Sequence, residues 1–124
     1  MAALARVRRE GPAVPVAPPD HPIDLAHLSR MTLGEHSLEC EVLALFARQA
    51  ELLLPRIHQG QPAVVAASAH TLKGSARGIG AWRVAQAAEA VELAGPAEFA
   101  AAVDALGTAI AETSVAIARL LRAH

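Results

Sequence analysis

Apolar residues recur at alternating steps of three and four from Ile23 onward, which is the pattern of helices with one buried face. No segment shows sustained alternation of β-branched residues, and no hairpin signal appears. The pattern predicts a short helix over residues 24–31 and long helices over residues 35–58, 62–77, 81–93 and 97–121. Long amphipathic helices with short connections predict an all-α fold, an antiparallel four-helix bundle with a short extra N-terminal helix.

The apolar positions also predict which face of each helix is buried. In the helix over residues 35–58 the predicted stripe is Leu38, Val42, Leu45, Phe46, Leu53 and Ile57. Pro55 lies within that span and should kink the helix or end it early. In the next helix the stripe is Val65, Ala69, Leu72, Ala76 and Ile79. In the last it is Phe99, Val103, Leu106, Ile110, Thr113, Ile117 and Leu120.

Proline and glycine mark the boundaries between these elements. Residues 1–22 contain five prolines after position 10 and are predicted to form a flexible arm, so the helical domain covers residues 23–124. Gly60-Gln61-Pro62 predicts the end of one helix and the start of the next. Gly78-Ile79-Gly80 is predicted to break or bend the chain, and Gly95-Pro96 to close the helix before it.

Composition narrows the class of protein. The chain has 124 residues, which is enough for one domain, and its 2% aromatic content predicts a core of small and aliphatic side chains. A net charge of −1 gives no global field toward nucleic acid or a membrane surface. The single cysteine, Cys40, excludes an intramolecular disulfide. No secretory signal is recognisable, and the longest stretch without charge, residues 57–72, contains Gly60 and Pro62, so we expect a cytoplasmic protein.

The run from His70 to Ala81 is the most informative part of the sequence. It places Lys73 and Gly74 three and four residues after His70, so all three share one patch of a helix surface. A glycine inside a helix costs about 0.5–1 kcal/mol relative to alanine. Gly74 therefore indicates that something approaches the imidazole closely, although packing against another helix is an alternative reason for it.

The chemistry at this patch follows from the residue types. A neutral imidazole is a nucleophile, and a solvent-facing His70 is mostly neutral near pH 7. Lys73 could pair with the oxygens of an attached phosphoryl group, and Arg77 could contribute at longer range. Because residues 52–88 contain no Asp or Glu, we expect a positive patch around His70 that steers an acidic partner; its cations are Arg56, Lys73, Arg77 and Arg83.

The other candidate side chains carry less information. The remaining histidines show no metal-ligand spacing and are predicted to be exposed; they are His21, His27, His36, His58 and His124. No metal site is expected. Trp82 could cap the core or serve as an exposed docking anchor, and the first is favoured.

The run His70-x-Leu72-Lys73-Gly74-Ser75, followed by Ile79-Gly80-Ala81, resembles the signature of the histidine phosphotransfer (HPt) domains of bacterial phosphorelays. The residues that fit the family's next helix are Val84, Ala88, Val91 and Glu92. The resemblance covers roughly residues 23–121. It implies a four-helix bundle, phosphorylation at His70, and receiver domains as donor and acceptor. Gly78, where the family often has Asn, and Val84 and Val91, where Leu is common, depart from the pattern.

Two functions follow as hypotheses. The first is a phosphocarrier in a multistep phosphorelay, in which His70 takes a phosphoryl group from a receiver aspartate and passes it to another receiver. The alternative is a non-catalytic helical module that binds or sequesters receivers by the same face. No Gly-rich nucleotide-binding segment is present, so no ATP-dependent kinase activity is expected. We expect a monomer without its own cofactor, with Mg²⁺ on the receiver partner, which could belong to a hybrid sensor kinase.

Overall fold

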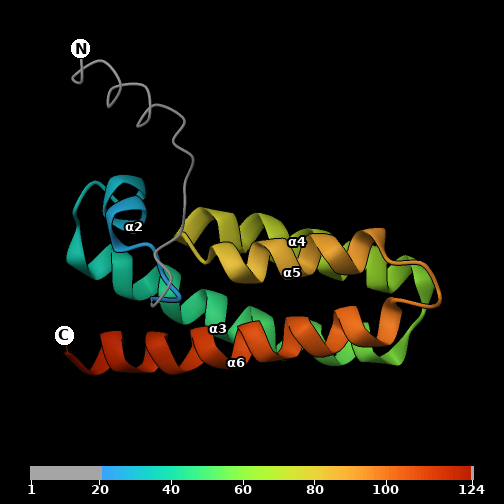
Figure 1. The fold of residues 1–124 in the computed structure, drawn as a ribbon. Helices are drawn as coiled ribbons and strands as arrows, with labels where there is room; N and C mark the ends of the chain where they lie inside the picture. The colour runs from blue at the N-terminus through green and yellow to red at the C-terminus, as the bar shows by residue number, and fades with distance from the viewer. Residues whose placement is uncertain (1–20, 124) are drawn as a thin grey trace, which may run out of the picture.

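The computed structural model describes residues 21–123, which form an all-α bundle. Its helices are α2 (Leu25–Met31), α3 (His36–Gln59), α4 (Pro62–Ile79), α5 (Trp82–Leu93) and α6 (Phe99–Ala123). The four long helices contact one another in cyclic order, with α4 and α5 side by side above α3 and α6 in Figure 1. The predicted four-helix bundle with a short N-terminal helix is confirmed. The predicted arm lies outside the described residues except for its last two positions.

The helix ends follow the local sequence signals. Asp24 caps α2 by accepting a hydrogen bond from the His27 amide. Pro62 occupies the first turn of α4, as predicted. Gly60 and Gly80 adopt the left-handed conformation, each with φ of 77°, and end α3 and α4. The break predicted over residues 78–80 begins later than predicted. Helix α4 continues through Gly78 to Ile79 and ends at the left-handed Gly80.

The core agrees with the predicted stripes on α4 and α6. All five predicted α4 residues are buried, and Leu72 and Ala76 are fully enclosed. On α6 the central five predicted residues are buried, while Phe99 and Leu120 pack at the edge. Alanines of α4 and α5 are part of the core, since Ala69, Ala76 and Ala88 have no solvent exposure. Helices with alanine at their contacts can lie close together.

Helix α3 departs from the prediction in two ways. It continues through Pro55 to Gln59, so an early end at the proline is wrong. Its core face contains Leu43, Phe46, Ala50 and Ile57, whereas Leu38 and Leu45 from the predicted stripe are exposed. The helix carries two apolar stripes, and only one of them faces the bundle.

Helix α2 is held against the junction of α4 and α5 through Asp24. The Asp24 amide donates to the Gly80 carbonyl at 2.9 Å, and the Trp82 indole N–H donates to the Asp24 carboxylate at 2.9 Å. The Trp82 hydrogen bond is the largest cause that lowers the pKa of Asp24. A Cβ on Gly80 would lie only 2.9 Å from both Asp24 Cβ and the Asp24 carbonyl oxygen. Only glycine fits this contact.

A histidine and the tryptophan complete this attachment. His27 is half-buried, and its Nε2 lies 2.9 Å from the carbonyl oxygen of Arg77 near the end of α4. Its ring packs edge-on against Trp82, with 4.9 Å between centroids. The prediction of an exposed His27 is therefore wrong, and His21 is also half-buried. Trp82 is partly buried, and its hydrogen bond to Asp24 holds α2 in place. It is therefore neither a simple cap on the core nor a free, exposed docking anchor.

One helix in the described part of the chain, α6, is long and apolar enough to cross a membrane by length and composition. Its apolar stripe packs in the bundle core against α3 and α5. The core helices of soluble proteins meet the same test, so this property is weak support for a membrane span.

Candidate functional site

The outward face of α4 presents His70. Ala69 and Leu72 point into the core. His70 lies on the opposite side of the helix, so its side chain faces solvent and is 73% exposed. Its imidazole therefore stands on the surface of the bundle, within reach of another molecule.

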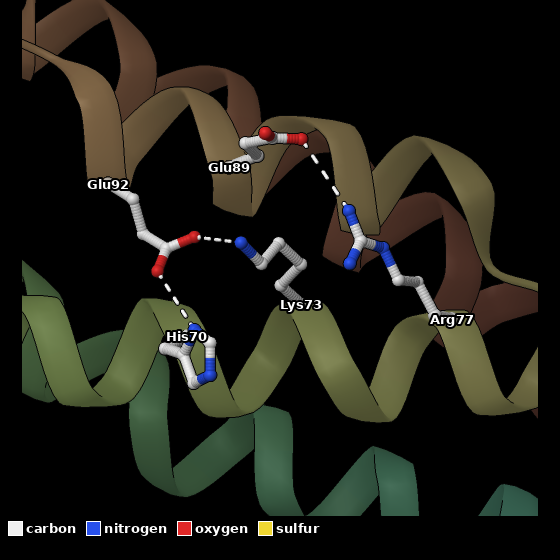
Figure 2. A network of polar contacts seen from close by, with 5 residues as sticks. All are labelled: His70, Lys73, Arg77, Glu89 and Glu92. Atoms are coloured by element: carbon white, nitrogen blue, oxygen red, sulfur yellow. Dashed lines mark hydrogen bonds and ion pairs between the residues drawn. The ribbon is translucent and has the colours of Figure 1, made fainter.

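Glu92 of α5 holds both His70 and Lys73. One carboxylate oxygen lies 3.1 Å from His70 Nδ1, and the other lies 2.6 Å from the Lys73 ammonium (Figure 2). Lys73 is 15% exposed and Glu92 is 19% exposed, so this pair is shielded from bulk water while the imidazole is not. A single carboxylate thus links a nucleophile and a cation across the α4–α5 contact.

This carboxylate determines the tautomer of the ring. The hydrogen bond from Lys73 lowers the pKa of Glu92, burial opposes this effect, and the hydrogen bond to His70 lowers the pKa further. Glu92 is therefore ionised near neutral pH and can only accept hydrogen bonds. His70 Nδ1 must donate, which leaves the lone pair of a neutral ring on Nε2. Figure 2 shows Nε2 on the side of the ring away from Glu92.

The expected positive patch is not found as a set of unpaired cations. Arg77 lies 3.6 Å from Glu89, with both side chains about half exposed. Arg83 lies 3.0 Å from Glu112 of α6. Residues 52–88 contain no Asp or Glu, but acidic residues of α5 and α6 pair with the cations of this stretch in the folded domain. The prediction of a strongly positive surface is therefore wrong for these positions.

Gly74 opens the surface one turn beyond His70. A Cβ built at Gly74 would meet no atom within 4 Å, and the same holds for Gly78 another turn on. The packing explanation for Gly74 therefore fails within this bundle. Gly74 leaves the α4 backbone exposed one turn from the imidazole, and Gly78 adds open space one turn farther along.

An apolar pocket of about 500 Å³ adjoins the cluster at the end of the bundle where the α3–α4 and α5–α6 loops meet. Ala66, one turn before His70, lines it together with Glu92. Its remaining walls are mainly apolar and include Pro62, Val65, Val91, Pro96 and Phe99. The exposed imidazole thus has open space at Gly74 on one side and a mainly apolar pocket on the other.

The family model of the Hpt domain matches residues 37–120 of this chain. The chain belongs to the Hpt domain family. The Hpt domain is also similar to the crystal structure of the histidine phosphotransferase ShpA from Caulobacter crescentus. That match has 30% sequence identity and a TM-score of 0.67, and it covers 82% of this chain and 91% of the other. Among curated proteins, no sequence matches this chain.

Membership of the family settles the broad class of activity. The Hpt domain functions in phosphotransfer within a phosphorelay, together with receiver domains. The resemblance drawn from the run at residues 70–81 is confirmed. In the described part of the chain, no group of three or more His, Cys, Asp or Glu residues could hold a metal ion.

The structure brings three of the four predicted site residues of the Hpt domain together and adds one. His70, Lys73 and Gly74 share one patch, while Arg77 reaches away from it to Glu89. Glu92 is the added residue and is not among the site residues predicted from the sequence. A signal for it exists in the sequence: His70 and Glu92 lie at nearly equal distances before and after the turn at residues 80–81, which places them opposite each other in an antiparallel helix pair.

Proposed function

We propose that this Hpt domain is a phosphocarrier that accepts a phosphoryl group on Nε2 of His70 from the aspartate of one receiver domain and passes it to another. The observation that carries the proposal is the Glu92 contact to Nδ1, which leaves the Nε2 lone pair directed toward solvent. Lys73 and Gly74 are assigned to this site as well, and Arg77 to its rim.

The transfer step needs no base in this chain. The Nε2 lone pair forms a bond to phosphorus, the bond between phosphorus and the aspartyl oxygen breaks, and the receiver carboxylate leaves with the electron pair. The proton stays on Nδ1, so the phosphorylated ring carries a positive charge. Glu92 at 3.1 Å offsets that charge, and this stabilises the transition state as the charge develops. The reverse sequence returns the phosphoryl group to a second receiver.

Lys73 has two partners available in this scheme. In the free domain its ammonium rests against Glu92 at 2.6 Å. When a phosphoryl group is present on His70, the same ammonium lies one helical turn away and can turn toward the phosphoryl oxygens. The Mg²⁺ that offsets charge during transfer belongs to the receiver partner.

The surface around His70 suits a protein partner. The exposed Gly74 and the open space beside Gly78 permit close approach, and the neighbouring pocket offers apolar area to a docking side chain. All groups that the Hpt domain contributes to the transfer come from one chain, so one copy of the domain is sufficient for reaction with a receiver. We propose that the partners are receiver domains of bacterial two-component signalling in the cytoplasm, including that of a hybrid sensor kinase.

Labelling from a phosphorylated receiver tests the proposal. The wild-type domain should acquire phosphate that is labile in acid and stable in base, whereas His70→Gln should acquire none. His58→Gln is the matched control, because that histidine is exposed on α3. Phosphate on the His70→Gln variant would refute the assignment of the residue. Receiver binding without any labelling of the wild type would favour the alternative, a non-catalytic module that sequesters receivers.

A further inference from the structure

Helix α3 carries a second apolar stripe that the bundle does not use. Leu38, Leu45 and Leu52 are 37%, 57% and 63% exposed, and they are spaced by seven residues. A seven-residue repeat keeps side chains on one line of a helix, and this line extends over about 21 Å. Exposed leucines in such a line are typical of a helix that has a partner helix.

The charged residues between these leucines follow a self-complementary order. Glu41 lies three residues after Leu38, and Arg48 lies three residues after Leu45; both are exposed. Along the stripe the order is apolar, acidic, apolar, basic, apolar. Read in the opposite direction the order is the same except that acid and base are exchanged.

We propose that this stripe joins two copies of the chain in an antiparallel pair of α3 helices. A two-fold axis at Leu45 brings together residues of the two copies whose numbers add up to about 90. Leu38 then faces Leu52 of the second copy, Leu45 faces itself, and Glu41 faces Arg48. Such a contact is isologous, because both copies use the same surface and each residue pair away from the axis occurs twice.

The order of charges along the stripe favours a second copy of the chain in the antiparallel orientation. A parallel pair would place Glu41 against Glu41 and Arg48 against Arg48, which is unfavourable. The other neighbours on the stripe, Val42 and Gln49, are uncharged and add no conflicting pair. A second copy is the partner whose matching charges are already fixed by this sequence.

The contact should be weak. A stripe of about 21 Å on a single helix buries less area than stable interfaces do, so association should appear only at high protein concentration. The stripe lies on α3, whereas the His70 cluster is built from α4 and α5 (Figures 1 and 2). At high protein concentration the proposal therefore differs from the expected monomer. The pair would carry two His70 sites, one on each copy.

Sedimentation equilibrium of the full chain from about 10 µM to about 1 mM tests the contact. The wild type should show a rising average mass, and Leu45→Glu, which places two like charges on the axis, should weaken association at least tenfold. Leu93→Glu is the matched control, since this leucine is 77% exposed at the end of α5. A wild type that stays monomeric at all concentrations, or equal weakening by both variants, would overturn the proposal.

Charge reversal tests the antiparallel register. Glu41→Arg and Arg48→Glu should each abolish self-association, because each makes the facing pairs like-charged. Mixed together, the two variants should associate again, because every facing pair then has opposite charges. Failure of the mixture to associate would refute this register even where the wild type forms dimers. Labelling of the wild-type domain by a phosphorylated receiver does not depend on this association, so that measurement separates a failure of the pairing from a failure of the proposed transfer.

Discussion

Replacing Glu92 by glutamine removes one charge from the His70 cluster while keeping its shape. The ion pair with Lys73 at 2.6 Å becomes a hydrogen bond to a neutral amide, and the ammonium, only 15% exposed, is left without a counter-ion. The ammonium keeps a hydrogen bond but loses the opposite charge beside it, and leaving a buried polar or charged group incompletely paired costs about 1–3 kcal/mol or more. We therefore expect Glu92→Gln to reduce the free energy of unfolding by about 1–3 kcal/mol.

The same substitution should slow transfer. The amide can present its N–H₂ group to His70 Nδ1, which favours the wrong tautomer, and it cannot offset the charge that develops on the ring. A loss of about 1.4 kcal/mol in the transition state corresponds to a tenfold lower rate. We expect the rate of phosphoryl transfer from a receiver to fall by about tenfold or more, with smaller change in receiver affinity.

Two measurements test this reasoning. Thermal unfolding followed by circular dichroism should show a Tm lower by about 5–15 °C for a domain of this size. Rapid-quench transfer assays should show the slower step. Glu89→Gln is the matched control on the same helix, because its 3.6 Å pair with Arg77 is about half exposed and should contribute less than about 1 kcal/mol. Equal transfer rates for the two variants would refute the role given to Glu92.

Further outcomes follow from the same contacts. Gly74→Leu should slow transfer strongly by obstructing the receiver while leaving the fold intact, because open space surrounds the position; unchanged transfer would exclude the steric role. Gly80→Ala should destabilise the domain by about 1–3 kcal/mol in chemical denaturation, since its Cβ would meet Asp24 at 2.9 Å and its φ is 77°. The lowered pKa values of Asp24 and Glu92 mean that stability is full above about pH 5 and falls as the pH drops through about 4, which acid titration of unfolding measures; a flat profile would contradict it. Lys73→Ala should lower the transfer rate, and a salt series should show little change in docking, because this cation is already paired.

The sequence predicts the fold well because local signals and packing agree for most helices. On α4, steps of three and four place the apolar residues on one face, and the structure buries all of them. On α3 the same reasoning fails, because residues from two apolar stripes alternate and the sequence alone does not say which stripe faces the bundle. The predicted stripe includes Leu45, which is 57% exposed, and lacks Leu43, which is buried.

Site residues that lie close together in the sequence could be predicted, whereas a residue from another helix could not. His70, Lys73 and Gly74 lie within five residues of one another, so helical spacing alone places them on one patch. Glu92 comes from another helix, and its role depends on the register of α4 against α5. A count of charges along the chain therefore predicted an excess of positive charge, whereas the packed helices place carboxylates against Lys73 and Arg77.

The attachment of α2 moves the physical boundary of the domain toward the N-terminus. The family match begins at residue 37, but Ile23 and Leu28 are part of the hydrophobic core, and Asp24 binds the turn between α4 and α5. A fragment cut at the family boundary would lose these contacts and uncover the end of the helix that carries His70. We therefore expect the unit that unfolds cooperatively to begin at Ile23, and fragments designed for transfer assays should retain this segment.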